Sequence, residues 1–397
     1  MSRDLTAVLA DMVAFPTVSS APVTALADYI ADRCEAAGMR VERYESEPGK
    51  CNVVCSAGPI TEPTGAKASA SASASASDRP GVVLSGHMDV VPVVGQPWTS
   101  DPFTLTQRGD NLHGRGACDM KAFLAAIVYA LPKLPLKHLK HELVFAFTHD
   151  EETGCNGSRL LVDRLLSEGR ALPTSCLIGE PTSLGIFRMH PGHVVVRVTC
   201  RGQAAHSSKP DLGRSAILLA GRVLGALERL ASDWRARAAN ADPVLAALLE
   251  RPFVVLNVGT IHGGNAINIV PDRCVIDVGF RPLPGMIVED LVRELTERVS
   301  DIHSRDVEVD LQRVTPAMLT PEGTALEGIL RGFSHGPKIG AAAFATDGGN
   351  LERLGLNTLV FGPGSIDVAH KADEFVPIAE LVRAVDVVEA VVGSRCV

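Results

Sequence analysis

Val82-Val-Leu-Ser-Gly-His-Met-Asp-Val-Val-Pro92 is the stretch on which the fold depends. Its apolar start is typical of a buried strand, and it places His87 and Asp89 just beyond the end of that strand. The imidazole can bind a metal ion, and Asp89 can accept the proton on the ring nitrogen that faces away from the metal. Because a single His/Asp pair is also common in exposed turns, the endings of the other strands decide between these interpretations.

Three further apolar runs also end in groups that can bind a cation. After the first of them stand four consecutive titratable groups, three of them acidic, which repel one another unless cations compensate. Strands separated by helices predict an α/β domain, in which ligands bind where the carboxyl ends of the strands open. The runs and the residues that follow them are Glu142–Thr148 with His149, Asp150, Glu151 and Glu152, Ser175–Gly179 with Glu180, and Asn357–Phe361 with His370 in the next loop.

Asp119 lies in Gly114-Arg-Gly-Ala-Cys-Asp-Met-Lys121, which leads into an apolar helix. A carboxylate at a helix N-terminus is usually a cap, so capping remains the alternative to metal binding. The two glycines allow a close approach of the backbone. They do not form the dinucleotide fingerprint, which needs a third glycine and a preceding strand in register.

The chain is predicted to contain two domains. Residues 1–181 and 315–397 form the α/β domain, and residues 182–314 form an inserted α+β domain with a small antiparallel sheet and two helices. The inserted strands are expected at Val194–Cys200, Phe253–Ile261 and Val275–Arg281, and its helices at Ser215–Leu230 and Val288–Val299. An alternating Ala-Ser run over residues 68–77 cannot bury apolar surface and predicts a flexible loop.

Composition excludes several classes of protein. The 397 residues are 46% hydrophobic, ample for a packed core, and the net charge of -8 is spread along the chain, which argues against nucleic-acid binding. Neither a secretory segment nor a membrane-spanning run is present, so a soluble cytoplasmic protein is expected. The 9 cysteines show no paired spacing and are expected to be reduced, mostly structural thiols.

The candidate ligands are enough for two metal ions. A catalytic zinc uses about three protein ligands, so five ligands serve two ions only if one carboxylate is shared, and Asp119 is placed to share. Glu151 is left over and is the candidate general base, because a base must reach the water without being tied down as a ligand. Mixed His and carboxylate ligands suit zinc, with cobalt or manganese as substitutes. The five predicted ligands are His87, Asp119, Glu152, Glu180 and His370.

Other candidates lie outside this cluster. His206, as a single histidine in the inserted domain, would usually be structural. The glycine-rich loop 263–271 carries Asn268, and this amide together with Arg281 can hold a carboxylate. Asp347 is a candidate to bind an amine of the substrate, or alternatively a helix cap.

The motifs resemble, nearly end to end, those of the dinuclear zinc amidohydrolases that include aminoacylase, glutamate carboxypeptidase and succinyl-diaminopimelate desuccinylase. Within that group, the chain is most similar to the acetylornithine deacetylase branch at four places: residues 179–184, 261–266, 281–286 and the final motif. The motifs that carry the resemblance are Ser85–Pro92, Gly114–Lys121, Asp150–Gly154, Gly179–Thr182, Ala205–Ser208, Arg281–Gly285 and Gly362–Glu374.

The resemblance implies a zinc-peptidase-like catalytic domain with an inserted dimerisation domain, and hence a homodimer. One metal would take His87 and Glu180 and the other Glu152 and His370, with Asp119 bridging through a loop that contains a cis peptide bond. The resemblance also implies that His206 stabilises the oxyanion in the partner's active site. Asn268 and Arg281 match positions that hold the substrate carboxylate.

The implied reaction is hydrolysis of N2-acetyl-L-ornithine, a small-molecule substrate, to ornithine and acetate. The alternatives are a deacylase of another N-acyl amino acid, a dipeptidase with the same metals, or a metal-binding scaffold without catalysis. A serine hydrolase is disfavoured, because no Gly-x-Ser-x-Gly elbow occurs. Two departures from the family pattern are Pro191, where relatives often carry a basic residue, and the Ala-Ser insertion.

Overall fold

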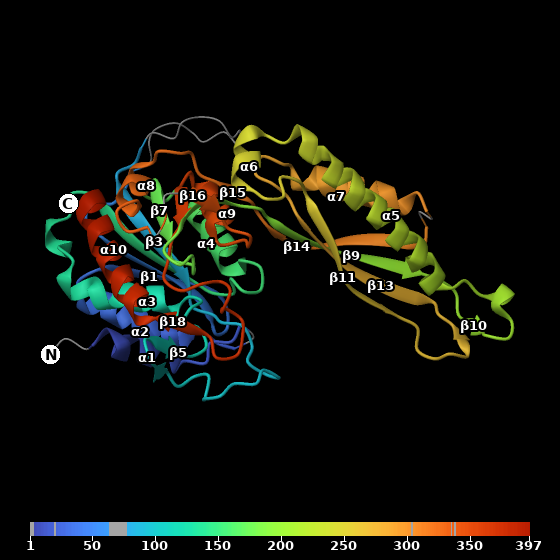
Figure 1. Ribbon diagram of the computed structural model, residues 1–397, viewed down its shortest axis with the longest axis horizontal. Helices are drawn as coiled ribbons and strands as arrows, with labels where there is room; N and C mark the ends of the chain where they lie inside the picture. The colour runs from blue at the N-terminus through green and yellow to red at the C-terminus, as the bar shows by residue number, and fades with distance from the viewer. Residues whose placement is uncertain (1–3, 20, 63–77, 303–304, 335, 337–338) are drawn as a thin grey trace. The chain divides into compact units, whose positions relative to one another are not determined.

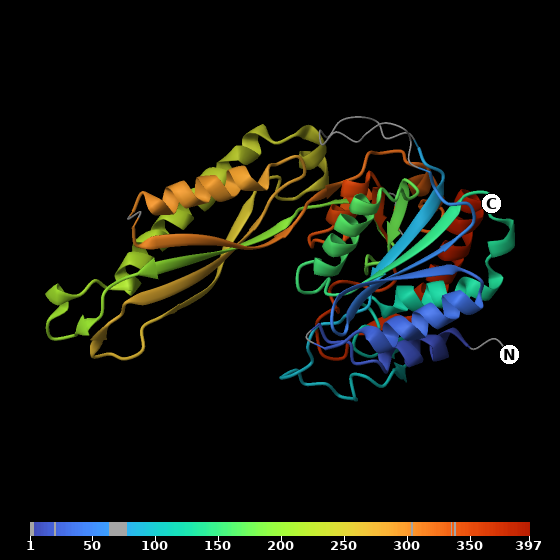
Figure 2. The ribbon, with the colours of Figure 1, turned by 180° about the vertical axis from the view of Figure 1, so that it is seen from behind.

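The computed structural model describes residues 4–19, 21–62, 78–302, 305–334, 336 and 339–397 (Figures 1 and 2). The Ala-Ser run that was predicted to form a loop lies outside these residues. The chain divides into two compact units, which are described separately. Unit 1 comprises Met1–Met189, Met318–Ala342 and Thr346–Val397, and unit 2 comprises His190–Ala317 and Ala343–Ala345.

Unit 1 is built on a mixed sheet that has nine strands within the described residues, in the order β1-β2-β6-β3-β7-β17-β8-β15, with β16 paired to β8. Its centre is parallel: β3 pairs in parallel with both β6 and β7, and β7 with β17. The strands are β1 (Arg40–Glu47), β2 (Lys50–Ala57), β3 (Gly81–His87), β6 (Glu142–Thr148), β7 (Ser175–Ile178), β8 (Ile186–His190), β15 (Met318–Leu319), β16 (Ile339–Ala341) and β17 (Asn357–Val360).

Helices cover both faces of this sheet (Figures 1 and 2). Successive strand residues point to opposite faces, so Val82 and Leu84 pack with α1, α2, α3 and α10, whereas Val83 packs with α4. Because helices cover both faces of the sheet, its central strands are continuous apolar runs. The helices are α1 (Leu5–Val13), α2 (Thr24–Ala36), α3 (Lys121–Ala130), α4 (Asn156–Glu168), α8 (Ala325–Leu330), α9 (Gly348–Leu351) and α10 (Ile378–Cys396).

A small antiparallel sheet lies beside the main one in unit 1. It has the order β18-β5-β4 and joins Phe375 to His113 across the chain. Figure 1 shows β18 next to β5. This pairing brings the end of the final motif beside the segment that leads to Asp119. The strands are β4 (Thr106–Arg108), β5 (Asn111–His113) and β18 (Phe375–Pro377).

Unit 2 is an antiparallel sheet in the order β11-β13-β9-β14, with α5 and α7 along one face (Figure 1). Alternate residues of β9, such as Val196 and Val198, are buried against these helices, as a sheet with one covered face requires. A two-stranded pair, β10 and β12, stands apart from the sheet. The elements are β9 (His193–Arg201), β10 (Ala205–His206), α5 (Ala216–Ala236), α6 (Pro243–Leu248), β11 (Val255–Gly263), β12 (Ile269–Val270), β13 (Arg273–Arg281), α7 (Val288–Ser300) and β14 (Val307–Thr315).

The predicted fold class is confirmed: a mainly parallel, helix-flanked sheet with a separate α+β unit that contains an antiparallel sheet. The boundary predicted after residue 181 differs from the observed division, because β8 pairs with the sheet of unit 1. All 9 cysteines are free and buried, as expected for reduced structural thiols. Among the described residues, no helix combines the length and apolar character that a membrane span requires.

Candidate metal centre

Three parallel strands of unit 1 deliver polar side chains to one edge of the sheet. β3 ends at His87, which is in register with Thr148 at the end of β6, and β7 ends two residues before Glu180. Glu151 follows β6 by three residues. The ligand atoms of His87, Glu151 and Glu180 lie within 4.8 Å of one another. The strand endings that the sequence singled out therefore do meet.

Asp119 lies between two histidines that are far apart in the sequence. Its Oδ1 is 3.0 Å from His87 Nε2, and its Oδ2 is 3.0 Å from His370 Nε2. A cis peptide bond joins Asp119 to Met120, as the family resemblance implied. Since Met120 occupies the N-cap position of α3 and the Asp119 side chain bonds to imidazoles, the capping alternative does not hold.

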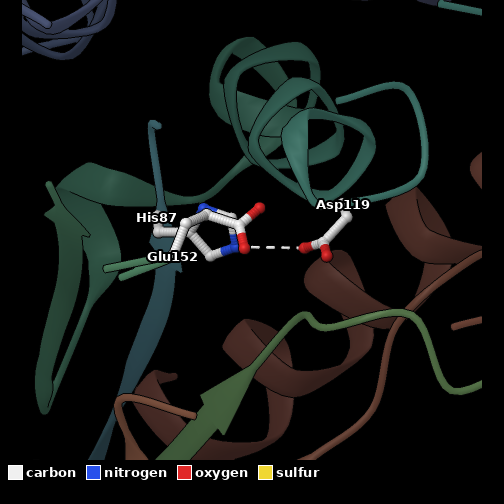
Figure 3. A group of neighbouring side chains, drawn as sticks. All are labelled: His87, Asp119 and Glu152. Atoms are coloured by element: carbon white, nitrogen blue, oxygen red, sulfur yellow. Dashed lines mark hydrogen bonds and ion pairs between the residues drawn. The ribbon is translucent and has the colours of Figure 1, made fainter. Parts of the chain in front are cut away.

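Each histidine also faces a second carboxylate. His87 Nε2 is 3.6 Å from Glu180 Oε1, and His370 Nε2 is 3.1 Å from Glu152 Oε2. The ligand atoms of His87, Asp119 and Glu152 also lie within 4.8 Å of one another, and Figure 3 shows these three side chains converging. These contacts place His87 beside Glu180 and His370 beside Glu152, with the Asp119 carboxylate between the two histidines.

The charges of this cluster perturb one another strongly. Burial alone would lower the pKa of His87, but Glu180 and Asp119 outweigh it and raise that pKa well above its ordinary value. Hydrogen bonds to Asp119 and Glu152 raise the pKa of His370 to about 10. Burial, reinforced by the neighbouring carboxylate of Asp119, raises the pKa values of Glu180 and Glu152. The cluster is an acidic, largely buried space that favours positive charge.

The donor set fits divalent cations. Glu152 Oε1 is buried without a hydrogen-bond partner among the described residues. Leaving such an atom unsatisfied costs about 1–3 kcal/mol, so its position is explained if it binds a cation. Two imidazole nitrogens with carboxylate oxygens are a donor set that suits zinc. We conclude that the residues present fit a site for metal ions.

Glu151 lies beside this cluster, and within the described residues it forms no hydrogen bond with His87 or His370. Its backbone N–H donates to Asp89 Oδ1 at 3.0 Å, and the thiol of Cys155 donates to its Oε1 at 3.3 Å. Burial and the nearby carboxylate of Asp347 raise the pKa of Glu151, although His87 opposes that rise. A carboxylate with a raised pKa is suited to taking up and releasing a proton.

Asp89 lies next to His87 but acts differently from the prediction. His87 Nδ1 is 2.9 Å from the backbone carbonyl oxygen of Asp89, whereas the nearer carboxylate oxygen is 3.8 Å away. The carboxylate instead accepts hydrogen bonds from the backbone N–H groups of Glu151 and Glu152 and from the hydroxyl of Ser19. Asp89 therefore fixes the loop after β6, and its carbonyl orients the imidazole.

Comparison with known proteins supports one family. The model of peptidase family M20/M25/M40 matches residues 83–394 of the chain.

The chain belongs to peptidase family M20/M25/M40.

Curated relatives and solved structures extend this match. The acetylornithine deacetylase of Myxococcus xanthus is 34% identical over 401 residues, covering 99% of this chain and 97% of the relative. The acetylornithine deacetylase of Erwinia tasmaniensis is 34% identical over 321 residues, 80% of each chain. An M20 family metallo-carboxypeptidase from Sulfolobus solfataricus, 17% identical, superposes with a TM-score of 0.76 over 98% of both chains. A tripeptidase from Staphylococcus aureus, 20% identical, gives 0.73 over 98% of this chain and 96% of its own. These structures establish the fold.

Asp347 of this M20 chain is buried beside Glu151. It occupies the N-cap position of α9, but its side chain makes no capping hydrogen bond, so the capping alternative does not hold. Its Oδ2 accepts a hydrogen bond of 2.6 Å from Thr148, and its Oδ1 is buried without a hydrogen-bond partner among the described residues. The ligand atoms of Asp347, Glu151 and Cys155 lie within 4.8 Å of one another.

The remaining predicted residues of this M20 chain lie in unit 2. His206 on β10 is exposed, and Asn268 is close to it, since the carbonyl of Asn268 accepts a 3.0 Å bond from Ser207 N–H. Arg281, at the far end of β13, is eight residues from Arg273, a distance of roughly 26 Å along a strand. Unit 2 therefore brings His206 and Asn268 together but not Arg281.

Some supporting residues of this M20 site were not predicted from the sequence. Lys50, buried on β2, donates to Asp150 Oδ1 at 2.6 Å and so ties the loop of Glu151 to the sheet. The position of Lys50 next to a strand-like apolar run was the one feature of the sequence that could have indicated this role. Arg115 and Glu374 lie inside the quoted motifs, yet their contacts depend on a pairing between β5 and β18 that the sequence pattern does not reveal.

Proposed function

We propose that this M20 hydrolase cleaves the acetamide of N2-acetyl-L-ornithine to L-ornithine and acetate, a step of arginine synthesis. The observation that carries the proposal is the 34% identity to an acetylornithine deacetylase over 99% of the chain. The grouping of the buried His87 with carboxylates in unit 1, which the exposed His370 contacts, supports a metal-dependent reaction. An amide is stable in water, so its hydrolysis needs both an activated water and a stabilised oxyanion.

His87 and Glu180 would hold one divalent ion and Glu152 and His370 the other, with the Asp119 carboxylate shared between them. Zinc suits this donor set best, with cobalt or manganese as substitutes. When bound, such ions polarise a carbonyl and lower the pKa of water toward neutrality. One Asp119 oxygen contacts His87 and the other contacts His370, which supports the shared role of this carboxylate.

Glu151 is the proposed general base. It accepts a proton from the water that attacks the acetyl carbonyl and then passes it to the nitrogen as the C–N bond breaks, which gives acetic acid and the amine. The acid then loses its proton, so that acetate and the protonated amine are the products at neutral pH. Two contacts support this role. Asp89 fixes the Glu151 backbone, and the weak donor Cys155 contacts one carboxylate oxygen, which leaves the other oxygen able to exchange a proton.

His206 is the proposed oxyanion donor, and it would act in the active site of a second copy of the chain. Its exposure, and that of Asn268, support a contact outside unit 2. We propose a homodimer formed through unit 2, in which Asn268 of the second copy, next to His206, and Arg281 of the chain that binds the substrate hold the α-carboxylate of the substrate. Asp347, whose buried Oδ1 has no partner among the described residues, is the proposed acceptor for the side-chain ammonium group.

The deciding experiment is a substrate panel run on protein reconstituted with zinc or cobalt. It would compare N2-acetyl-ornithine with acetylmethionine, acetylnorvaline, succinyl-diaminopimelate and simple dipeptides, and measure kcat/KM for each. We expect N2-acetyl-ornithine to have the highest value. A preference for a succinylated substrate or a dipeptide would replace the proposal with the corresponding deacylase or dipeptidase, and inactivity toward every member would favour a metal-binding scaffold.

A further inference from the structure

A buried carboxylate holds the backbone at Asp119. Glu374 is 1% exposed, and its Oε1 accepts hydrogen bonds from the N–H groups of Cys118 at 2.8 Å and Asp119 at 3.0 Å. The chain reaches this position because β18, which begins at Phe375, pairs with β5. Glu374 thus holds the Asp119 loop as Asp89 holds the loop of Glu151.

Arg115 holds Glu374 and extends the network. The guanidinium is 1% exposed and donates through Nη1 to Glu374 Oε2 and through Nη2 to Gln96 Oε1, the latter at 2.6 Å. It also lies over the ring of Trp98, with Cζ 5.1 Å from the ring centroid. A planar guanidinium that donates in two directions fixes the separation of its two acceptors, which a lysine ammonium does less well.

Gln96 carries the network to His370. Its Nε2 donates to the backbone carbonyl of His370 at 2.8 Å. His370 has φ of 63°, in the left-handed region that a residue with a side chain adopts only when its surroundings hold it there. A continuous chain of hydrogen bonds therefore runs from the amide of Asp119 through Glu374, Arg115 and Gln96 to His370.

We propose that Arg115 and Gln96 are positioning residues, which set the separation of Asp119 and His370 and thereby the affinity of the cation site that these two form with Glu152. The inference rests on the proposed two-metal function. The other site shares Asp119 but should be weakened less, because His87 at the end of β3 and Glu180 just after β7 are held by two strands that pair directly with each other. Breaking the network is therefore expected to act mainly on one of the two ions.

Gln96→Met is the principal variant. It keeps the length of the side chain and removes its three hydrogen bonds, from Arg115, from Trp98 Nε1 and to His370. Gln96 is only half-buried, so folding should survive. Arg115→Lys keeps the charge but cannot bond both acceptors in the same plane. Gln107→Met is the matched control. Gln107 also donates through Nε2 to a backbone carbonyl of unit 1, that of Gly109 at 3.1 Å, and neither residue belongs to the network.

Zinc binding to metal-free protein would be followed by calorimetric titration, with His370→Ala identifying which binding event belongs to the second site. We expect Gln96→Met and Arg115→Lys to weaken that event about 10–100-fold and to weaken the other binding event much less. At a fixed, subsaturating zinc concentration, kcat should fall with KM unchanged, and Gln107→Met should behave as the wild type.

Wild-type affinity for both ions in Gln96→Met would overturn the proposal, as would equal weakening of both. If Arg115→Lys does not fold, Gln96→Met decides alone. Failure of this proposal can be distinguished from failure of the proposed function, because ion binding is measured without a substrate. A wild-type protein that binds two ions but does not hydrolyse N2-acetyl-ornithine would contradict the proposed substrate. The ion affinities of Gln96→Met would still decide the role of the network.

Discussion

Histidines in the two units experience opposite electrostatic environments. In unit 1, carboxylates raise the pKa of His87 well above its ordinary value and that of His370 to about 10. In unit 2, burial and the nearby Arg281 lower the pKa values of His190 and His193 to about 4. The same residue type is thus stabilised as a cation in one unit and as a neutral ring in the other.

The difference indicates which charges each region accepts. The space between His87 and His370 is rich in carboxylates and suits cations, in agreement with the proposed metal sites. The corner of unit 2 around Arg281 contains a second guanidinium, since Arg313 Nη2 is 3.1 Å from His193 Nδ1, and its histidines stay neutral near pH 7. Such a corner suits an anion, in agreement with the proposed binding of the substrate carboxylate by Arg281.

The largest expected effect tests the acidic region. Glu151→Ala should lower kcat by about 10⁴-fold, the upper end of the range for a general base, because no proton acceptor would remain for the attacking water. Metal content should not change, since Glu151 is proposed as a base and not as a ligand. Turnover by zinc-loaded protein and its metal content would be measured together, with the exposed Glu168→Ala as control. Normal turnover would remove Glu151 from the mechanism, and loss of metal would make it a ligand.

The next effect tests whether unit 2 contributes to the chemistry. His206→Ala should lower kcat by about 10²–10³-fold, as the loss of an oxyanion donor does elsewhere. Because His206 is proposed to act in the partner's site, mixed dimers of Glu151→Ala and His206→Ala chains should regain one intact site. Random pairing should then restore about a quarter of wild-type activity in the mixture. Mixtures as inactive as the separate variants would contradict action between subunits.

A smaller effect tests the basic region. Arg281→Met should raise KM by about 10–100-fold, the loss expected for a hydrogen bond to a charged group, with a small change in kcat. The control substrate is the analogue of N2-acetyl-ornithine in which a carboxamide replaces the α-carboxylate. Because this analogue lacks the carboxylate, its KM should differ little between the wild type and Arg281→Met. Steady-state kinetics on both compounds would check this. An equal loss for the acid and its amide would contradict carboxylate binding by Arg281.

Much of the fold was predictable because the pattern of residues is local. Apolar runs such as Val82–Leu84 and Glu142–Thr148 end in titratable groups, and parallel strands bring such endings to one edge. β14 was missed because it lies near the expected end of the inserted domain, and several of its side chains, such as Glu308 and Asp310, are not buried. Its status as a strand depends on pairing with β9, which a sequence window does not contain.

The sequence predicted which side chains of unit 1 lie together, but not the contacts that each of them makes. The chemistry of His87, Asp119 and Glu180 identified them as candidate ligands, and the structure brings them together. The use of the Asp89 carbonyl by His87 was not predictable, because its carboxylate is drawn to the N–H of Glu151, 62 positions away in the chain. Contacts of that length are decided by tertiary packing and not by spacing.

The smallest expected effect concerns stability and sharpens the comparison from the side of unit 2. His190 is fully buried with a pKa of about 4, against an ordinary value of 6.5, so the folded chain binds fewer protons than the unfolded chain between these values. The contribution of the neutral ring to the free energy of unfolding is fully present above pH 6.5 and is lost as the pH falls toward 4, by on the order of 2–3 kcal/mol.

His190→Gln should remove this loss of stability without changing kcat near pH 8. Urea unfolding of unit 2, followed by the fluorescence of Trp234 in a Trp98→Phe background, would be compared at pH 7.5 and 4.5, with the exposed His262→Gln as control. An identical pH dependence in the wild type and His190→Gln would mean that the neutral ring of His190 contributes nothing, and the contrast between the two units would then rest on His193 alone.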